Sequence, residues 1–123
     1  MKRQFSFSKY EQEVRPMLRE KLNRAESTED VKKFFVYAFR DLMNRVSEGR
    51  VTVEYEDILL DLSERDGFSI GDRLGATPDF VSLWNSSDLP HIVKRMAESA
   101  IKRHKYLDRH RDKTETKMYP IPG

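Results

Sequence analysis

Hydrophobic positions recur with a helical period over most of the chain. The clearest run covers residues 31–46, where apolar side chains fall at i, i+3, i+4, i+7, i+8 and onward, as on one face of an amphipathic helix. Ser27 or Thr28 offers an N-cap, and Gly49 can close the helix. The apolar stripe consists of Val31, Phe34, Phe35, Ala38, Phe39, Leu42, Met43 and Val46.

The N-terminal segment predicts one or two helices before this stripe. Ser8 and Glu11 have the spacing of a capping box, so a helix can begin there. Pro16 lacks the amide donor, so either the helix kinks or a new helix begins with Pro16 in its first turn, which we favour. One face of that helix then carries Met17, Leu18, Leu22 and Ala25.

Two patterns compete in residues 51–64. Residues 51–55 alternate like a short strand, yet Thr52 is also a fair N-cap and the acidic residues after it suit a first helical turn. We expect a helix over 53–64, with a minor β element at 51–55 as the alternative.

The last strongly periodic segment is a long helix that Ser87 or Asp88 can cap and that tolerates Pro90 in its first turn. The sequence therefore predicts an all-α fold, a small bundle of about five to six helices in a single domain over residues 1–112. Residues 1–48 supply the N-terminal helices, residues 53–112 the others, and residues 113–123 a flexible tail.

Residues 67–86 predict two short helices joined by a tight turn. Ser69 can cap the first, and Gly75 sits where the chain would leave it with a positive φ. Thr77 and Pro78 have the residue types of an N-cap and a first helical position. The inward-facing positions are Ile70, Leu74, Val81 and Trp84.

This stretch resembles the helix-turn-helix of lambda repressor and Cro-like DNA-binding proteins. Residues 74–77 look like their turn and residues 81–84 like the middle of their recognition helix, a likeness over about 20 of 123 residues. It implies sequence-specific binding of double-stranded DNA, as in a small transcriptional regulator. The groove-facing side chains would be Thr77, Asp79, Ser82, Leu83 and Ser86, with phosphate contacts from Arg73, Lys94 and Arg95.

Charge is distributed in blocks, although the net charge is only +2. Residues 1–47 carry +4, residues 48–72 carry −6, residues 73–93 carry −1 and residues 94–117 carry +5. The blocks either pair with one another as solvated helix faces or leave the last one to bind a partner. The longest apolar run has six residues against the roughly 20 that span a bilayer, and there is no cysteine, so we expect a cytoplasmic protein without membrane contact.

The candidate chemistry is sparse. His104 and Asp108 are four residues apart, but two ligands make a weak metal site, and no nucleotide loop or nucleophile–base pair is visible. We therefore expect no enzyme activity, metal or cofactor. The alternative to DNA binding is a non-enzymatic helical protein–protein interaction module.

A homodimer is expected in addition, because one motif with few basic contacts should bind DNA weakly. Two copies spaced by a duplex turn, about 34 Å, would restore affinity. The stripe of Phe34, Phe35 and Phe39 is either intramolecular core or the dimer seam, and it is the candidate seam.

Overall fold

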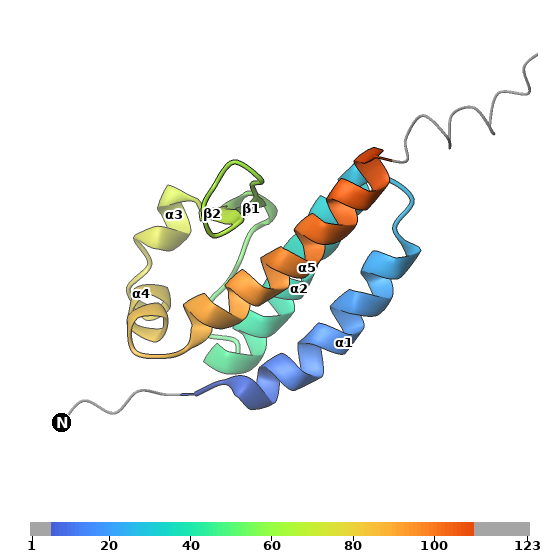
Figure 1. Cartoon of the computed structure of the whole chain (residues 1–123). Coiled ribbons are helices and arrows are strands. Elements are labelled where there is room, and N and C mark those ends of the chain that lie inside the picture. Colours follow the sequence, from blue (N-terminus) through green and yellow to red (C-terminus); the bar gives the residue numbers. More distant parts are fainter. Residues whose placement is uncertain (1–5, 110–123) are drawn as a thin grey trace, which may run out of the picture.

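The computed structural model describes residues 6–109 and confirms an all-α fold with a small β element. Its frame consists of three long helices (Figure 1), α1 (Ser8–Arg24), α2 (Thr28–Ser47) and α5 (Leu89–Arg109). The tail predicted at 113–123 lies outside the described residues. Between α2 and α5 lie a 3₁₀ turn, η1 (Tyr55–Asp57), the strands β1 (Ile58–Leu60) and β2 (Phe68–Ile70), and the helices α3 (Asp72–Gly75) and α4 (Pro78–Asn85).

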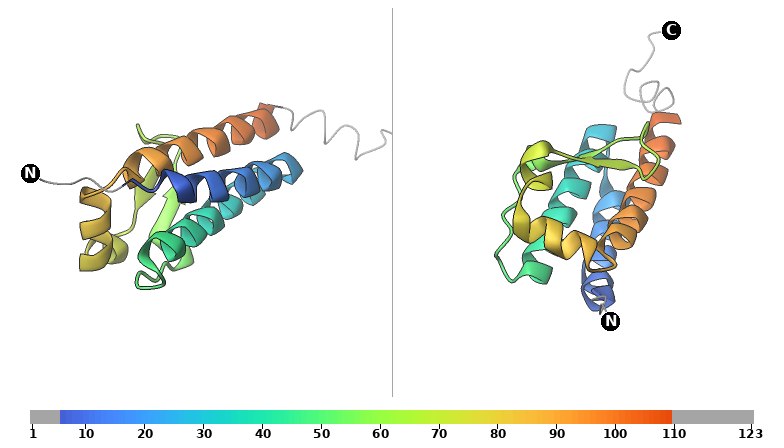
Figure 2. Two further views of the ribbon diagram at one scale, coloured as in Figure 1. Left: turned by 90° about the horizontal axis from the view of Figure 1, so that it is seen from below. Right: turned by 90° about the vertical axis from the view of Figure 1, so that its left-hand side faces the viewer.

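The three long helices pack around one apolar core, and each contacts both of the others. Phe35 and Phe39 of α2 are fully buried there, as are Ile92 and Met96 of α5. The short strands with α3 and α4 form a second layer over the side where α2 and α5 meet, while α1 lies on the far side (Figure 2). This layer covers the groove between α2 and α5. It does not cover the grooves between α1 and α2 and between α1 and α5.

Helix α1 runs through Pro16 without a break, so the expected new start at Pro16 is wrong. Pro16 is exposed, which leaves the carbonyl group that loses its donor on the solvent side of the helix. The predicted capping box is also not formed, because no side chain caps α1. Instead Asp88 accepts hydrogen bonds from the Phe7 amide (2.8 Å) and the Ser6 hydroxyl (3.0 Å), and Glu11 turns inward.

Helix α2 has the caps that its sequence predicts. The Ser27 hydroxyl accepts a hydrogen bond from the Asp30 amide at 3.1 Å. The helix ends at Ser47, after which Glu48 and Gly49 both have left-handed backbone conformations, with φ of 54° and 81°.

The helix expected over 53–64 is wrong, and the β element lies at 58–70 rather than at 51–55. Glu54 and Asp57 cap each other across η1, and the chain then extends into β1. Strand β1 pairs antiparallel with β2, with Ile58 opposite Ile70. Ile58 and Leu60 are both buried with Leu59 exposed between them, so burial follows the strand period that the helical spacing had concealed.

The helix-turn-helix region also differs from its expectation. Ser69 belongs to β2 and cannot cap a helix, because α3 begins only at Asp72 and comprises a single turn. Gly75 lies inside that turn without a positive φ, so the tight left-handed turn predicted there is wrong. Helix α4 does begin at Pro78, and it is held by the buried Phe80, whose ring stacks on Trp84 at 5.2 Å.

Candidate functional site

The predicted DNA-reading side chains lie on one short helix, but most have little freedom to contact bases. Asp79 and Ser82 are exposed. Leu83 is half-buried and packs against the core. The hydroxyl groups of Thr77 and Ser86 donate to main-chain carbonyls of their own neighbourhood, Arg73 at 3.0 Å and Ser82 at 2.6 Å.

The three predicted phosphate ligands bind carboxylates instead. Arg73 donates to Asp57, with Nε 3.1 Å from Oδ1, and to the Thr52 carbonyl at 2.9 Å. This hydrogen-bonded guanidinium lowers the pKa of Asp57, and it outweighs the opposing effect of burial. Arg73 thus ties α3 to the preceding turn.

Arg95 and Lys94 are engaged in the same way on α5. Arg95 forms a two-point contact with Glu11 of α1, at 2.7 and 2.8 Å, and Glu11 is buried. Lys94 lies 3.8 Å from Asp66. The structure therefore does not gather these cations beside the outward residues of α4.

The predicted seam is corrected as well. Phe35 and Phe39 are completely buried inside the monomer, so they form core and cannot contact a second chain. Of the three, only Phe34 is half-buried, because it lies at the edge of the apolar stripe. The stripe is wide enough to fill the core and still leave one ring at the edge of a groove.

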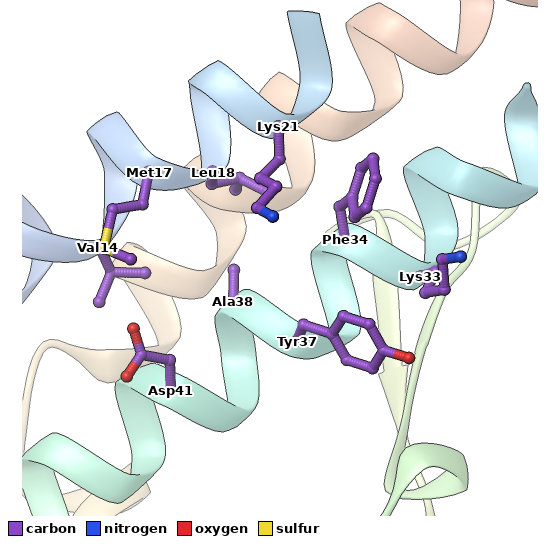
Figure 3. Close-up of a pocket in the computed structure, with 9 residues that line it drawn as sticks. All are labelled: Val14, Met17, Leu18, Lys21, Lys33, Phe34, Tyr37, Ala38 and Asp41. Carbon is purple, nitrogen blue, oxygen red and sulfur yellow. The ribbon is translucent and has the colours of Figure 1, made fainter. Parts of the chain in front are cut away.

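That groove lies between α1 and α2 and has a volume of about 250 Å³. Figure 3 shows that both helices contribute side chains to it, with Met17 and Leu18 on one wall and Phe34, Tyr37 and Ala38 on the other. Met17 is 52% exposed and Tyr37 46% exposed. Helix α5 packs behind this pair of helices, and at the edge of the groove the Tyr37 ring contacts that of Tyr55 of η1, with the ring centres 6.2 Å apart.

The two ends of the α1–α2 groove differ in charge. At the end near the α1–α2 connection, the ammonium groups of Lys21 and Lys33 each lie 5.8 Å from the centre of the Phe34 ring. At the other end Arg45 bridges two carboxylates, Asp41 at 3.0 Å and Glu13 at 3.1 Å, which leaves an excess of negative charge.

The second open groove lies between α1 and α5, has a volume of about 440 Å³ and is lined mostly by polar and charged residue types. Sequence reasoning missed it because its two walls come from residues about 80 positions apart. The basic block of residues 94–117 indicated that the last helix could bind an anion. The sequence did not show which other element lies beside that helix. The lining residues are Arg19, Leu22, Asn23, Ser99, Lys102, Arg103 and Tyr106.

Within residues 6–109, no three histidine or acidic side chains gather in a way that could hold a metal ion. None of the helices in this described part is both long and apolar enough to cross a membrane. Compared with known protein families, with curated proteins and with solved structures, the chain gives no match.

Proposed function

We propose that this chain is a non-enzymatic helical protein–protein interaction module that binds a second copy of itself through the α1–α2 face. The observation that carries the proposal is the apolar α1–α2 groove, where Met17 and Tyr37 are about half exposed beside Phe34. Apolar and aromatic side chains gathered in one groove are typical of the centre of a protein interface.

The charge pattern of the groove favours a second copy as the occupant. Helices α1 and α2 form an antiparallel pair, with Lys21 and Lys33 at one end and the Asp41–Arg45–Glu13 cluster at the other. A two-fold axis that lies in the plane of this face, perpendicular to the helix axes, places the basic end of each copy against the acidic end of the other.

The position of the apolar side chains agrees with the same symmetry. Met17 and Tyr37 lie near the middle of α1 and α2, so a central two-fold axis brings them against the same residues of the partner copy. A face of two helices, about 26 Å long and about 20 Å wide, would bury roughly 1,000 Å² in total. That area is at the small end for a specific interface, so we expect a dimer of micromolar affinity.

Sequence-specific binding of duplex DNA by α4 stays a prediction with less support. Residues 48–93, which include α3 and α4, carry three basic and ten acidic side chains. Such a surface repels phosphates, and the nearby Arg73 already binds Asp57. A cytoplasmic location, which the cysteine-free composition favours, is also part of the proposal.

The decisive experiment is sedimentation equilibrium of the full chain with Met17→Glu, read beside circular dichroism. We expect the wild type to dimerise in the micromolar range and Met17→Glu to be a folded monomer, because a buried carboxylate without a partner opposes association. Leu59→Glu is the matched control, since Leu59 is 51% exposed but lies on the β hairpin. It should dimerise like the wild type.

Two results would overturn the proposal. One is a wild-type chain that stays monomeric at several hundred micromolar. The other is equal weakening by Met17→Glu and Leu59→Glu, which would place the contact somewhere other than the α1–α2 groove.

A further inference from the structure

We propose that the α1–α5 groove binds single-stranded nucleic acid, with its cations on the phosphate backbone and Tyr106 stacked on a base. This site is on the other side of α1 from the proposed dimer face and does not depend on it. Three features support this proposal: two cations without a carboxylate partner within residues 6–109, an exposed aromatic ring and the charge of the rest of the molecule.

The cations of this groove are available for an anion. Arg19 reaches it from α1 and Lys102 from α5, and both side chains are exposed. Within residues 6–109, neither has a carboxylate within 4 Å, in contrast to Arg73, Lys94 and Arg95. Ser99 and Asn23 add hydrogen-bonding groups between them. Paired cations hold the fold together, and these two line an open groove.

Arg103 fixes the floor and the end of the groove. Its guanidinium donates to the Ala25 and Asn23 carbonyls, at 3.1 and 3.3 Å, and so ties the C-terminus of α1 to α5. The same guanidinium lies 4.9 Å from the centre of the Tyr106 ring. Arg103 therefore positions Tyr106 as a half-exposed platform, with 47% of that residue accessible.

A cationic groove that ends in an exposed aromatic ring suits a single strand better than a duplex. Unpaired bases can leave the stack and lie on an aromatic side chain, whereas the bases of a duplex are stacked inside the helix. A phosphorylated peptide would use the cations but not the ring. The aromatic platform is what makes nucleic acid the preferred ligand.

The charge of the whole molecule directs a strand to this side. The layer of β1, β2, α3 and α4 lies away from α1 and belongs to the acidic block of residues 48–93. Phosphates are repelled there and attracted to α1 and the C-terminal half of α5, where Lys105 and Arg109 are also exposed.

The test is fluorescence anisotropy of a labelled single strand of about ten nucleotides, within the range that one groove of this kind covers. Two cations contacting phosphates, Arg19 and Lys102, predict that log affinity falls with log salt concentration with a slope near −1.4, at about 0.7 per contact. Lys102→Ala should reduce this slope by about 0.7. Arg65→Ala is the control, because Arg65 is an exposed cation in the β1–β2 connection, outside the groove.

The aromatic ring is tested by a second pair of variants. Tyr106→Ala should weaken binding at least about fivefold, because stacking of one base is lost. Tyr106→Phe keeps the ring and should bind within about twofold of the wild type. A structural role of the hydroxyl group would instead make both variants weak.

Each of the following results would overturn the proposal. The wild type shows no salt-dependent binding, or Lys102→Ala and Arg65→Ala lose affinity equally. Another such result combines two findings: polyphosphate displaces the labelled strand as effectively as an unlabelled strand does, and Tyr106→Ala binds with wild-type affinity. The groove would then be a phosphate site without base contacts. The last such result is tighter binding of duplex DNA than of the single strand, which would favour duplex binding by α4 instead.

Discussion

Among the glycines, Gly67 rather than Gly75 carries a backbone requirement. Gly67 has a φ of +86°, and a Cβ there would lie 2.6 Å from Ile101 Cδ1 and 3.1 Å from Ala97 Cβ. The sequence places Gly75 at the end of a short helix, which is a common place for a positive φ, but the turn continues with right-handed residues. Gly67 lies in the tight connection between β1 and β2, where the hairpin approaches α5.

Gly67→Ala should therefore lower the free energy of unfolding by about 1–3 kcal/mol, because alanine is strained at that φ and its methyl group crowds α5. Gly75→Ala should change it by less than about 1 kcal/mol, since a Cβ there meets only Ile70 Cγ2 at 3.9 Å. Urea denaturation of both variants decides the matter. A larger loss at Gly75 than at Gly67 would contradict the backbone assignment.

At the scale of elements, the long helices α2 and α5 follow from the sequence because each has many apolar positions on one face, and α2 also has a side-chain cap at its start. Residues 53–64 do not, because Ile58, Leu59 and Leu62 fit a helical period as well as a strand. Pairing with β2 and burial of Ile58 and Leu60 decide between the two, and both depend on contacts distant in sequence.

The candidate grooves were predictable only in part for the same reason. The phenylalanine stripe of α2 is visible in the sequence, yet the position of α1 determines that Phe34 reaches a groove while Phe35 fills the core. Arg19 and Lys102 share no local pattern. They become neighbours because Glu11–Arg95 and the Arg103 contacts align α1 with α5 along their lengths.

The Asp57–Arg73 pair connects two elements and should make stability depend on pH. The pKa of Asp57 is lowered from its ordinary value of 3.8, so the folded state binds fewer protons than the unfolded state in acid. Its stabilisation is present above about pH 4 and is lost as the pH falls further. Asp57→Asn should reduce stability at neutral pH and flatten the decline below pH 4 in thermal melts.

The exposed carboxylate of α4 provides the control for this experiment. Asp79→Asn removes the same charge without breaking a contact of the described residues, so its stability curve should run parallel to that of the wild type. If the stability curve of Asp57→Asn also runs parallel to that of the wild type, the Asp57–Arg73 pair does not determine how stability declines in acid.

At the scale of the whole molecule, α1 separates two surfaces of different chemistry. Its groove with α2 is apolar with opposite charges at its ends, and its groove with α5 is basic with an aromatic ring at one end. A dimer through the first leaves both copies of the second open. The two proposals can therefore fail separately, because Met17 and Lys102 lie in different grooves.

If both proposals hold, affinity should depend on strand length in a way that a monomer cannot reproduce. A single strand long enough to reach both α1–α5 grooves of a dimer binds the second one intramolecularly, at a high effective concentration. A short strand occupies one groove only. We expect Met17→Glu to bind a strand of about ten nucleotides as tightly as the wild type, but a strand of about 40 nucleotides at least about tenfold more weakly. Anisotropy titrations above the dimer dissociation constant measure both values. If the affinity of Met17→Glu relative to the wild type is the same at both strand lengths, the two grooves of a dimer do not bind one strand together. This holds even where dimerisation and strand binding each occur.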